Sequence, residues 1–199
     1  MIAVVDYKAG NLTSVMKALR AAGAEPAPTD DPTIVARADR IILPGVGHFA
    51  ATRFLEERGL RGAIEDRIAA GVPFLGICVG LQWLFAGSTE APDTPGLASF
   101  PAMCDRFAPG KKIPHVGWNS LSIRPDSPLF VGISNNSYVY FTHSFRAPVT
   151  NATVAVTEYG EPFSAAVERD NVMGVQFHPE KSGETGLHVL RNFLEWRPC

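Results

Sequence analysis

The chain has 199 residues, of which 46% are hydrophobic and 19% charged, and its net charge at pH 7 is −2. This balance fits a single globular domain over residues 1–199, and the lack of a basic run argues against nucleic acid as a partner. No apolar stretch approaches the roughly 20 residues that cross a bilayer, we find no secretory signal, and three cysteines are too few for a disulfide framework. We therefore expect a cytoplasmic protein that does not enter a membrane.

The first half of the chain alternates short apolar strands with amphipathic helices. Strands are expected at residues 2–5, 41–43 and 74–77. Helical spacing of apolar residues predicts helices over residues 12–19, 54–68 and 81–85, and Gly59 and Gly62 are positions where the second helix can be interrupted. This alternation predicts an α/β fold with an open, largely parallel central sheet that is flanked by helices.

The second half has a different pattern. Residues 88–112 are rich in Pro, Gly, Ser and Asp and are expected to form a loop with little regular structure. Short strands with short connections then follow, which predicts extra antiparallel or mixed strands attached to the parallel core. The expected strands are residues 121–123, 138–141, 153–156, 164–168 and 172–177. Apolar residues on one face predict a final helix over residues 187–194.

The segment FLGICVGLQ places Cys78 between Gly76 and Gly80, where the third expected strand ends. Open α/β sheets gather functional residues at the carboxyl ends of their strands. A Gly-x-Cys-x-Gly pattern there predicts a strand–turn–helix elbow that presents a nucleophile, because neighbouring Cβ atoms would collide at the tight crossing. A helix N-terminus beneath the sulfur would favour the thiolate. The alternative is a buried cysteine that only fills space.

A thiol nucleophile needs a base, and the base needs a group that orients it. His178 opens a His-Pro-Glu segment just beyond the last expected strand. Proline disfavours helical geometry at the residue before it, so we expect this segment to stay extended, with His178 and Glu180 pointing the same way. Glu180 would then hold one imidazole nitrogen while the other faces the sulfur. The alternative is a strand-end turn with a surface carboxylate.

Another glycine-rich turn, Pro44-Gly45-Val46-Gly47, follows a second expected strand. Backbone N–H groups of this turn can approach a ligand and form half of an oxyanion hole, and the N–H of Val79 would supply the other half. The alternative is that this turn has no function, because glycine-rich turns at strand ends are common in α/β proteins.

The segments PGVGHF, GICVGLQ and GVQFHPEKSG, in this order and spacing, resemble the triad-type, class I glutamine amidotransferases. KIPHVGWN and YVYFTHSF narrow the resemblance to the glutaminase subunits of imidazole glycerol phosphate synthase, in histidine biosynthesis. The resemblance covers essentially the whole chain.

The resemblance implies that Cys78 attacks the side-chain amide of glutamine, that His178 moves the protons and that Glu180 holds His178. Ammonia leaves, and water releases glutamate from a γ-glutamyl thioester. It also implies oxyanion or substrate-binding positions, which are Val46, Gly47, Val79, Gln82, His143, Ser144 and Phe145. His143 has a second interpretation as a polar residue at a strand end with no binding role.

The resemblance further implies a partner, because the sequence has no P-loop, GxGxxG or metal-ligand cluster that could serve ammonia-consuming chemistry. We expect no cofactor and no metal. The partner would be a cyclase subunit with a (βα)8-barrel fold, which receives ammonia and makes imidazole glycerol phosphate and aminoimidazole carboxamide ribotide. The implied docking residues are Asn11, Trp118, Tyr138 and Lys181. Each docking role has an alternative interpretation: Trp118 and Tyr138 can be core residues, and Lys181 can be a solvated surface charge.

Four positions depart from the family pattern. Lys8 occupies a position where relatives commonly carry glycine. Ala9 occupies a position where the residue is often bulkier or is proline, and Val79 occupies a position where leucine is frequent. His48 replaces a small residue after the PGVG turn, where it can either tune the turn or remain solvated.

Three other interpretations remain open. The same glutaminase chemistry can serve a different synthase, for pyridoxal phosphate synthesis or for sugar amination. A module with this fold can also bind glutamine or a partner for regulation without catalysis.

Cys104 and Cys199 lack the flanking glycines and strand-end position of Cys78. We expect them to be structural or incidental.

Overall fold

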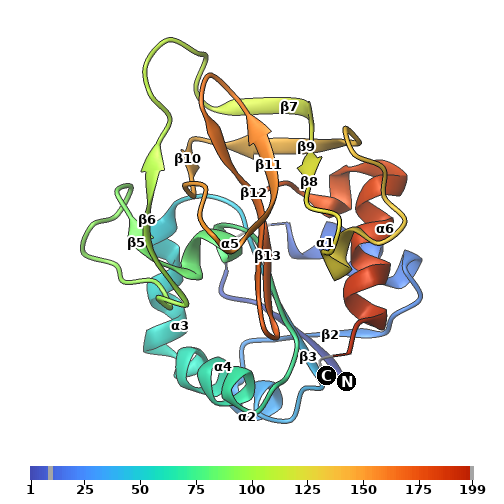
Figure 1. The fold of residues 1–199 in the computed structure, drawn as a ribbon. Coiled ribbons are helices and arrows are strands. Elements are labelled where there is room, and N and C mark those ends of the chain that lie inside the picture. Colours follow the sequence, from blue (N-terminus) through green and yellow to red (C-terminus); the bar gives the residue numbers. More distant parts are fainter. Residues whose placement is uncertain (9–10, 198–199) are drawn as a thin grey trace.

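The computed structural model of the chain describes residues 1–8 and 11–197 and is built around an eight-stranded sheet (Figure 1). The strand order is β2-β1-β3-β4-β13-β12-β11-β8. One half of this sheet is parallel throughout. It consists of β2 (Pro26–Thr29), β1 (Ile2–Val5), β3 (Arg40–Gly45), β4 (Phe74–Cys78) and β13 (Val172–Val175). The predicted α/β fold with a largely parallel sheet is confirmed.

The other half of the sheet is antiparallel and comes from the second half of the chain. It consists of β12 (Pro162–Arg169), β11 (Thr153–Glu158) and β8 (Ser122–Ile123). Two small sheets lie beside it. One orders β10 (Phe145–Arg146), β6 (Phe100–Arg106) and β5 (Phe85–Ser88), and the other pairs β7 (His115–Ser120) with β9 (Tyr138–His143). The expected antiparallel and mixed strands are thus present.

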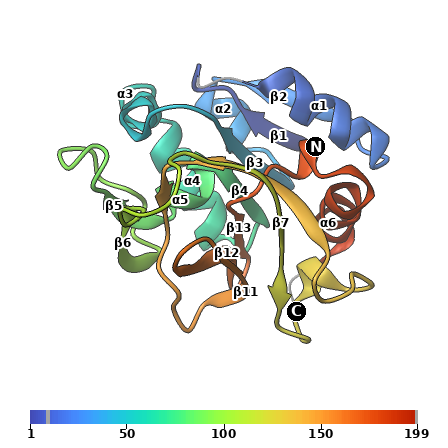
Figure 2. The ribbon, with the colours of Figure 1, turned by 90° about the horizontal axis from the view of Figure 1, so that it is seen from above.

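Helices cover both faces of the main sheet (Figures 1 and 2). On one side lie α1 (Leu12–Ala21) and α6 (Gly183–Glu195), which contact each other. On the other side lie α3 (Arg53–Glu57) and α4 (Leu60–Ala69), with α5 (Val79–Trp83) packed against β4. The short helix α2 (Pro32–Val35) packs against α4. Because helices cover both faces, β4 is buried along its whole length, which explains its continuous apolar sequence.

Gly59 interrupts the helical stripe that the sequence predicts over residues 54–68. Its φ of 67° lies in the left-handed region, where glycine is tolerated best, and it stands between α3 and α4. Gly62, the other candidate breaker, lies inside α4 and does not interrupt it.

Several elements differ from the sequence-based expectations, including β7, for which no strand was expected. The helix expected over residues 81–85 ends at Trp83, and Phe85 begins β5 instead. The segment expected to be a loop, residues 88–112, contains β6, which pairs in parallel with β5. The edge strand β2 was not expected because its sequence, PAPT, has two prolines. Edge strands tolerate proline, since one side of the strand needs no ladder hydrogen bonds.

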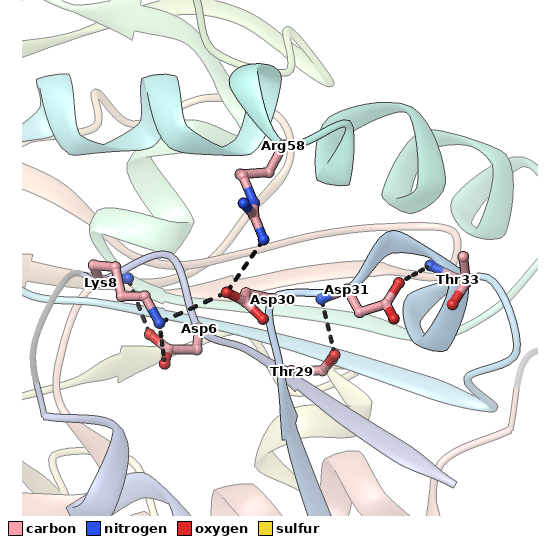
Figure 3. Close-up of polar contacts among 7 residues, drawn as sticks. All are labelled: Asp6, Lys8, Thr29, Asp30, Asp31, Thr33 and Arg58. Atoms are coloured by element: carbon pink, nitrogen blue, oxygen red, sulfur yellow. Dashed lines mark hydrogen bonds and ion pairs between the residues drawn. The ribbon is translucent and has the colours of Figure 1, made fainter.

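The loop after β1 carries an ionic cluster that involves Lys8 (Figure 3). Lys8 has a φ of 65°, and its backbone N–H donates to Oδ1 of Asp6 at 3.0 Å. Its ammonium lies 3.3 Å from Asp6 and 3.7 Å from Asp30, and the guanidinium of Arg58 lies 3.6 Å from the same Asp30. Because residue 8 adopts a left-handed backbone conformation, glycine is the residue best suited to this position. Ala9, the neighbouring departure, lies outside the described residues.

Within the described part of the chain, no helix has the length and apolarity needed to cross a membrane.

Candidate active site

Cys78 ends β4 and precedes α5 in a strained backbone conformation, with φ 56° and ψ −106°. A Cβ on Gly76 would overlap the carbonyl of Gly80, and a Cβ on Gly80 would overlap the carbonyl of Leu43 in β3. Both flanking glycines are therefore required by close backbone contacts. The strand–turn–helix elbow predicted from GICVG is confirmed, including its steric reason.

His178 reaches Cys78 because β13 is the direct neighbour of β4. Val175 pairs with Ile77 in register, which sets the following residues of the two strands side by side. The backbone N–H of His178 donates to the carbonyl of Tyr140 at 2.9 Å, so β9 also holds this position. Residues 78 and 178 thus meet, although 100 positions separate them in the sequence.

Glu180 orients the imidazole of His178. The distance from Nδ1 of His178 to Oε1 of Glu180 is 2.8 Å, and both side chains are buried. The same Oε1 accepts a hydrogen bond of 2.8 Å from Nδ2 of Asn11. The expected contact is present, but its geometric argument was wrong: His178 is extended, whereas Pro179–Lys181 form a 3-10 turn instead of continuing the extended segment.

The environment of His178 favours the imidazolium. Burial lowers its pKa, but the neighbouring sulfur of Cys78 and the carboxylate of Glu180 outweigh burial and raise the pKa to about 10. Nε2 is buried and has no hydrogen-bond partner of good geometry among the described residues. This nitrogen is therefore free to exchange a proton with the sulfur.

A cavity of about 260 Å³ opens beside the sulfur. It gathers Cys78 and all seven predicted oxyanion and substrate-binding positions from three separate parts of the chain. The lining residues are Val46, Gly47, Cys78, Val79, Gln82, Glu90, Pro114, Thr142, His143, Ser144 and Phe145. Gly47 has a φ of 112°, so the turn after β3 needs glycine at this point.

Two site residues were missed by the sequence analysis. Glu90 lines the cavity and accepts a hydrogen bond of 2.8 Å from the backbone N–H of Phe49. It lies in the segment expected to be a loop, where no motif marks it. Gln176 is fully buried, and its Nε2 lies 3.6 Å from Sγ of Cys78. Its place in the sequence, two residues before His178 and just after β13, brings it to the same end of the sheet as Cys78.

A family model described as glutamine amidotransferase class-I matches residues 3–196. The chain belongs to this family. Two curated relatives are described as imidazole glycerol phosphate synthase subunit HisH. The one from Methanothermobacter thermautotrophicus is 49% identical over 98% of each chain, and the one from Caldanaerobacter subterraneus subsp. tengcongensis is 47% identical over 100% of each. A solved structure described as a glutamine amidotransferase has a TM-score of 0.77 at 21% identity over 98% of each chain, which shows a shared fold.

Both levels of the resemblance in the sequence are therefore confirmed: the class I glutamine amidotransferases, and within them the glutaminase subunits of imidazole glycerol phosphate synthase. The relatives span the full length of the chain, so the likeness extends well beyond the motifs around the cysteine.

Three of the four predicted docking residues are exposed in this class I amidotransferase. Trp118 and Tyr138 expose 54% and 60% of their surface, so the alternative that they are core residues is wrong. The ammonium of exposed Lys181 lies 5.8 Å from the ring centroid of Tyr140, which borders Trp118 across the β7–β9 pair. Asn11 lies inward instead, on Glu180.

His48 and Cys104 have structural roles in this amidotransferase. His48 is exposed, and its Nδ1 accepts a hydrogen bond of 3.1 Å from the N–H of Ala50, at the start of the 3-10 turn Phe49–Thr52. Cys104 is fully buried in β6, and burial raises the pKa of its thiol, which makes it inert as expected. Cys199 lies outside the described residues.

Proposed function

We propose that the chain hydrolyses glutamine through a triad of Cys78, His178 and Glu180. Sγ of Cys78 attacks the side-chain amide carbon, and the resulting tetrahedral intermediate breaks its C–N bond. His178 first accepts the thiol proton and then gives a proton to the departing ammonia, and water hydrolyses the remaining thioester to glutamate. The observation that carries this proposal is the buried His178–Glu180 contact beside a strained cysteine at the edge of a cavity.

The substrate would occupy the cavity of about 260 Å³ with its amide at the sulfur. Backbone N–H groups of the turn at Val46 and Gly47, together with that of Val79, would stabilise the oxyanion. Gln82 and the backbone of residues 143–145 would hold the amino-acid end. Glu90 is the carboxylate that the cavity offers to the α-ammonium group. We infer that this charge pairing orients glutamine along the cavity.

The ammonia would pass to a cyclase subunit, for which we expect a (βα)8-barrel fold. The relatives are named as subunits of imidazole glycerol phosphate synthase, which supports the existence of such a partner. That subunit would form imidazole glycerol phosphate and aminoimidazole carboxamide ribotide, in the cytoplasm. The glutaminase itself would act as one domain over residues 1–199, without a cofactor or metal.

The docking face would include the exposed side of the β7–β9 pair, with Trp118, Tyr138 and Lys181. A cation above an aromatic ring beside an exposed tryptophan has the composition of an interface anchor. We propose that Asn11 acts differently. Its amide joins the loop before α1 to Glu180, so it can report docking at that loop to the triad.

The experiment combines the chain with candidate synthase subunits and follows glutamate release. We expect the histidine-pathway barrel, and not a pyridoxal phosphate or sugar-aminating synthase, to raise glutaminase activity. Cys78→Ala should abolish glutamine hydrolysis while the complex still uses added ammonia. Cys104→Ala is the matched control and should keep glutamine-dependent synthesis. Failure of every barrel to stimulate hydrolysis would overturn the acceptor assignment.

A second measurement separates catalysis from simple glutamine binding. A glutamine-like diazo-ketone should label Cys78 and leave Cys104 unmodified, because only an activated thiol beside the substrate cavity reacts. Glu180→Gln should lower turnover by far less than Cys78→Ala, since Glu180 orients the base and forms no bond to the substrate. Equal labelling of both thiols would support a non-catalytic binding module.

A further inference from the structure

A continuous series of hydrogen bonds joins the β7–β9 pair to the sulfur of Cys78, and the triad uses none of them. We call this series the polar chain. Its members in order are Asn119, His115, His143, the carbonyl of Phe145, Gln82 and Gln176. It begins beneath the exposed face that carries Trp118 and ends at Sγ.

The proton arrangement on the histidine side is fixed by the carbonyl of Phe145. A carbonyl oxygen only accepts, so Nδ1 of His143, at 2.9 Å, must carry the proton. Burial lowers the pKa of His143 to about 3, which keeps the ring neutral and leaves Nε2 as an acceptor. Nδ1 of His115, 3.2 Å away, must then donate to it.

The same logic extends to the outer end of the polar chain. Burial lowers the pKa of His115 to about 4, so this ring is also neutral and its Nε2 accepts. Nδ2 of Asn119 lies 3.4 Å from that nitrogen and donates a second hydrogen bond of 3.0 Å to the carbonyl of Glu158. Each histidine therefore has a single tautomer that satisfies its neighbours.

The inner end of the polar chain has an equally defined direction. The amide nitrogen of Gln82 donates to the carbonyl of Phe145 at 2.9 Å and to Oε1 of Gln176 at 3.1 Å. Because Oε1 of Gln176 accepts, the NH2 group of the same amide faces Cys78 and lies 3.6 Å from Sγ. An N–H donor directed at the sulfur stabilises the thiolate more than the thiol.

Burial makes the arrangement costly to disturb. Gln82, Gln176, His115 and His143 expose 3%, 0%, 3% and 6% of their surface, so a misdirected member would leave a buried polar group without a partner. The ring of His115 also stacks between Phe141 and Tyr159, with centroids 5.0 and 4.0 Å away. Stacking and hydrogen bonding are therefore two separable contributions of His115.

We propose that the polar chain is a positioning device for the nucleophile, in which His115 acts through His143, Phe145 and Gln82 to hold the NH2 group of Gln176 against Sγ of Cys78. The proposal rests on the proposed function, since it assigns a task to the same sulfur. Three other titratable groups lie around Cys78: His178 from the end of β13, the buried hydroxyl of Tyr7 after β1, and Glu90, which lines the same cavity. These are unchanged in the variants below.

Two substitutions at His115 separate the donor from the ring. His115→Phe keeps the stacking between Phe141 and Tyr159 but removes the N–H, whereas His115→Asn keeps an amide donor near the place of Nδ1 but removes the ring. The measurement is the pH dependence of iodoacetamide labelling of Cys78 in the full chain, mapped by peptide. A donor role predicts that His115→Phe moves the half-maximal labelling pH upward by about one unit, which is a tenfold change in the ionisation constant of the thiol. His115→Asn should stay near the wild type.

A substitution at Gln176 tests the proposal independently of His115. Gln176→Met keeps the volume of the side chain and removes the donor, so the labelling midpoint should rise at least as far as in His115→Phe. Thermal unfolding of each variant identifies any that fail to fold. If His115→Phe and Gln176→Met fold and both label with the wild-type pH midpoint, the proposal is overturned. The reverse order, with His115→Asn impaired and His115→Phe normal, also overturns it in favour of ring stacking.

The outcome can be told apart from failure of the proposed function. Iodoacetamide reacts with a thiolate whether or not glutamine binds, so it tests the polar chain alone. The glutamine-like diazo-ketone tests the glutaminase. Unmodified Cys78 with the diazo-ketone, together with shifted iodoacetamide midpoints in the variants, would refute the glutaminase and retain the polar chain.

Discussion

The glycines around Cys78 show how much of the site depends on single side chains. Gly76 and Gly80 face backbone carbonyls so closely that a methyl group at either position would overlap them. The elbow can form only because both residues lack Cβ atoms. The unusual backbone of Cys78 is held in place by this contact with β3, since Gly80 lies directly against the carbonyl of Leu43.

Gly80→Ala should therefore destabilise the fold by about 3 kcal/mol or more, the upper end of the range for overpacked positions. It should also abolish glutamine hydrolysis, because the sulfur moves with the elbow. Gly62→Ala is the matched control: a Cβ there meets nothing within 4 Å, and alanine inside α4 should stabilise by about 0.5–1 kcal/mol. Urea unfolding measures both. Equal stability of the two variants would contradict the steric account.

Lys8 offers a second prediction at this scale, because its backbone strain and its ionic contacts act in opposite directions. A non-glycine residue with a φ of 65° is strained, while exposed ion pairs contribute at most about 1 kcal/mol. Lys8→Ala keeps the strain and loses the ammonium, so it should be less stable than Lys8→Gly in denaturant unfolding. Raising the salt concentration should narrow the gap between the wild type and Lys8→Ala, because salt screens the ion pairs that only the wild type makes. A Lys8→Ala variant that is more stable than Lys8→Gly would disprove this account.

At the scale of elements, the strands missed from the sequence lie where pairing overrides local composition. β2 contains two prolines but occupies an edge, and β6 lies in a Pro- and Gly-rich region but pairs with β5 and β10. Periodicity describes the chain locally, whereas these strands are specified by partners distant in sequence. The helix over residues 12–19 and the core strands β1, β3 and β4 were predicted correctly because their apolar patterns are strong.

An ion pair joins the elements of the second half and gives a pH prediction. Arg146 in β10 lies 2.5 Å from Glu161, beside the start of β12, and Glu161 also accepts from the N–H of Ala108. Both hydrogen bonds lower the pKa of Glu161. A lowered folded-state pKa gives stability that is present above the usual carboxyl range, near pH 4.3, and is lost as the pH falls through the lower folded-state value.

The test compares the wild type with Glu161→Gln in urea unfolding as a function of pH. At pH 7 the wild type should be more stable by up to about 1 kcal/mol, the range of partly exposed ion pairs. The difference should shrink as the pH falls below the carboxyl range, because protonation removes the charge that glutamine lacks. A difference that stays constant with pH would show that packing, and not charge, accounts for it.

On the scale of the whole molecule, β13 connects two halves that differ in topology. It pairs in parallel with β4 and antiparallel with β12, so the last strand of the sheet in sequence lies in its interior. The parallel core and the antiparallel extension therefore share one strand, and α1 contacts α6 across the length of the chain. This arrangement favours a single cooperative unit.

Cys78 reports the parallel core, since it ends β4, and Cys104 reports the three-stranded side sheet, since it lies in β6. Pulse labelling of thiols at increasing urea concentration, mapped by peptide, should show the labelling rates of both changing at the same midpoint. Cys104 is fully buried and becomes reactive only when its region opens, whereas Cys78 lines a cavity and changes from its native labelling rate to that of an unfolded thiol. Two distinct midpoints would indicate two independently unfolding units within residues 1–199.

Local features of the sequence were enough to predict the class of the fold and the pairing of Cys78 with His178: glycines that permit an elbow, a proline after His178 and apolar runs that must be buried. The resemblance of its motifs to the family indicated most of the residues that line the cavity. Three contacts became visible only in the folded chain: Glu90 lines the cavity, Asn11 donates to Glu180, and the amide nitrogen of Gln176 faces the sulfur. Such contacts join residues far apart in the chain, and their geometry follows from strand order and register, which local sequence does not encode.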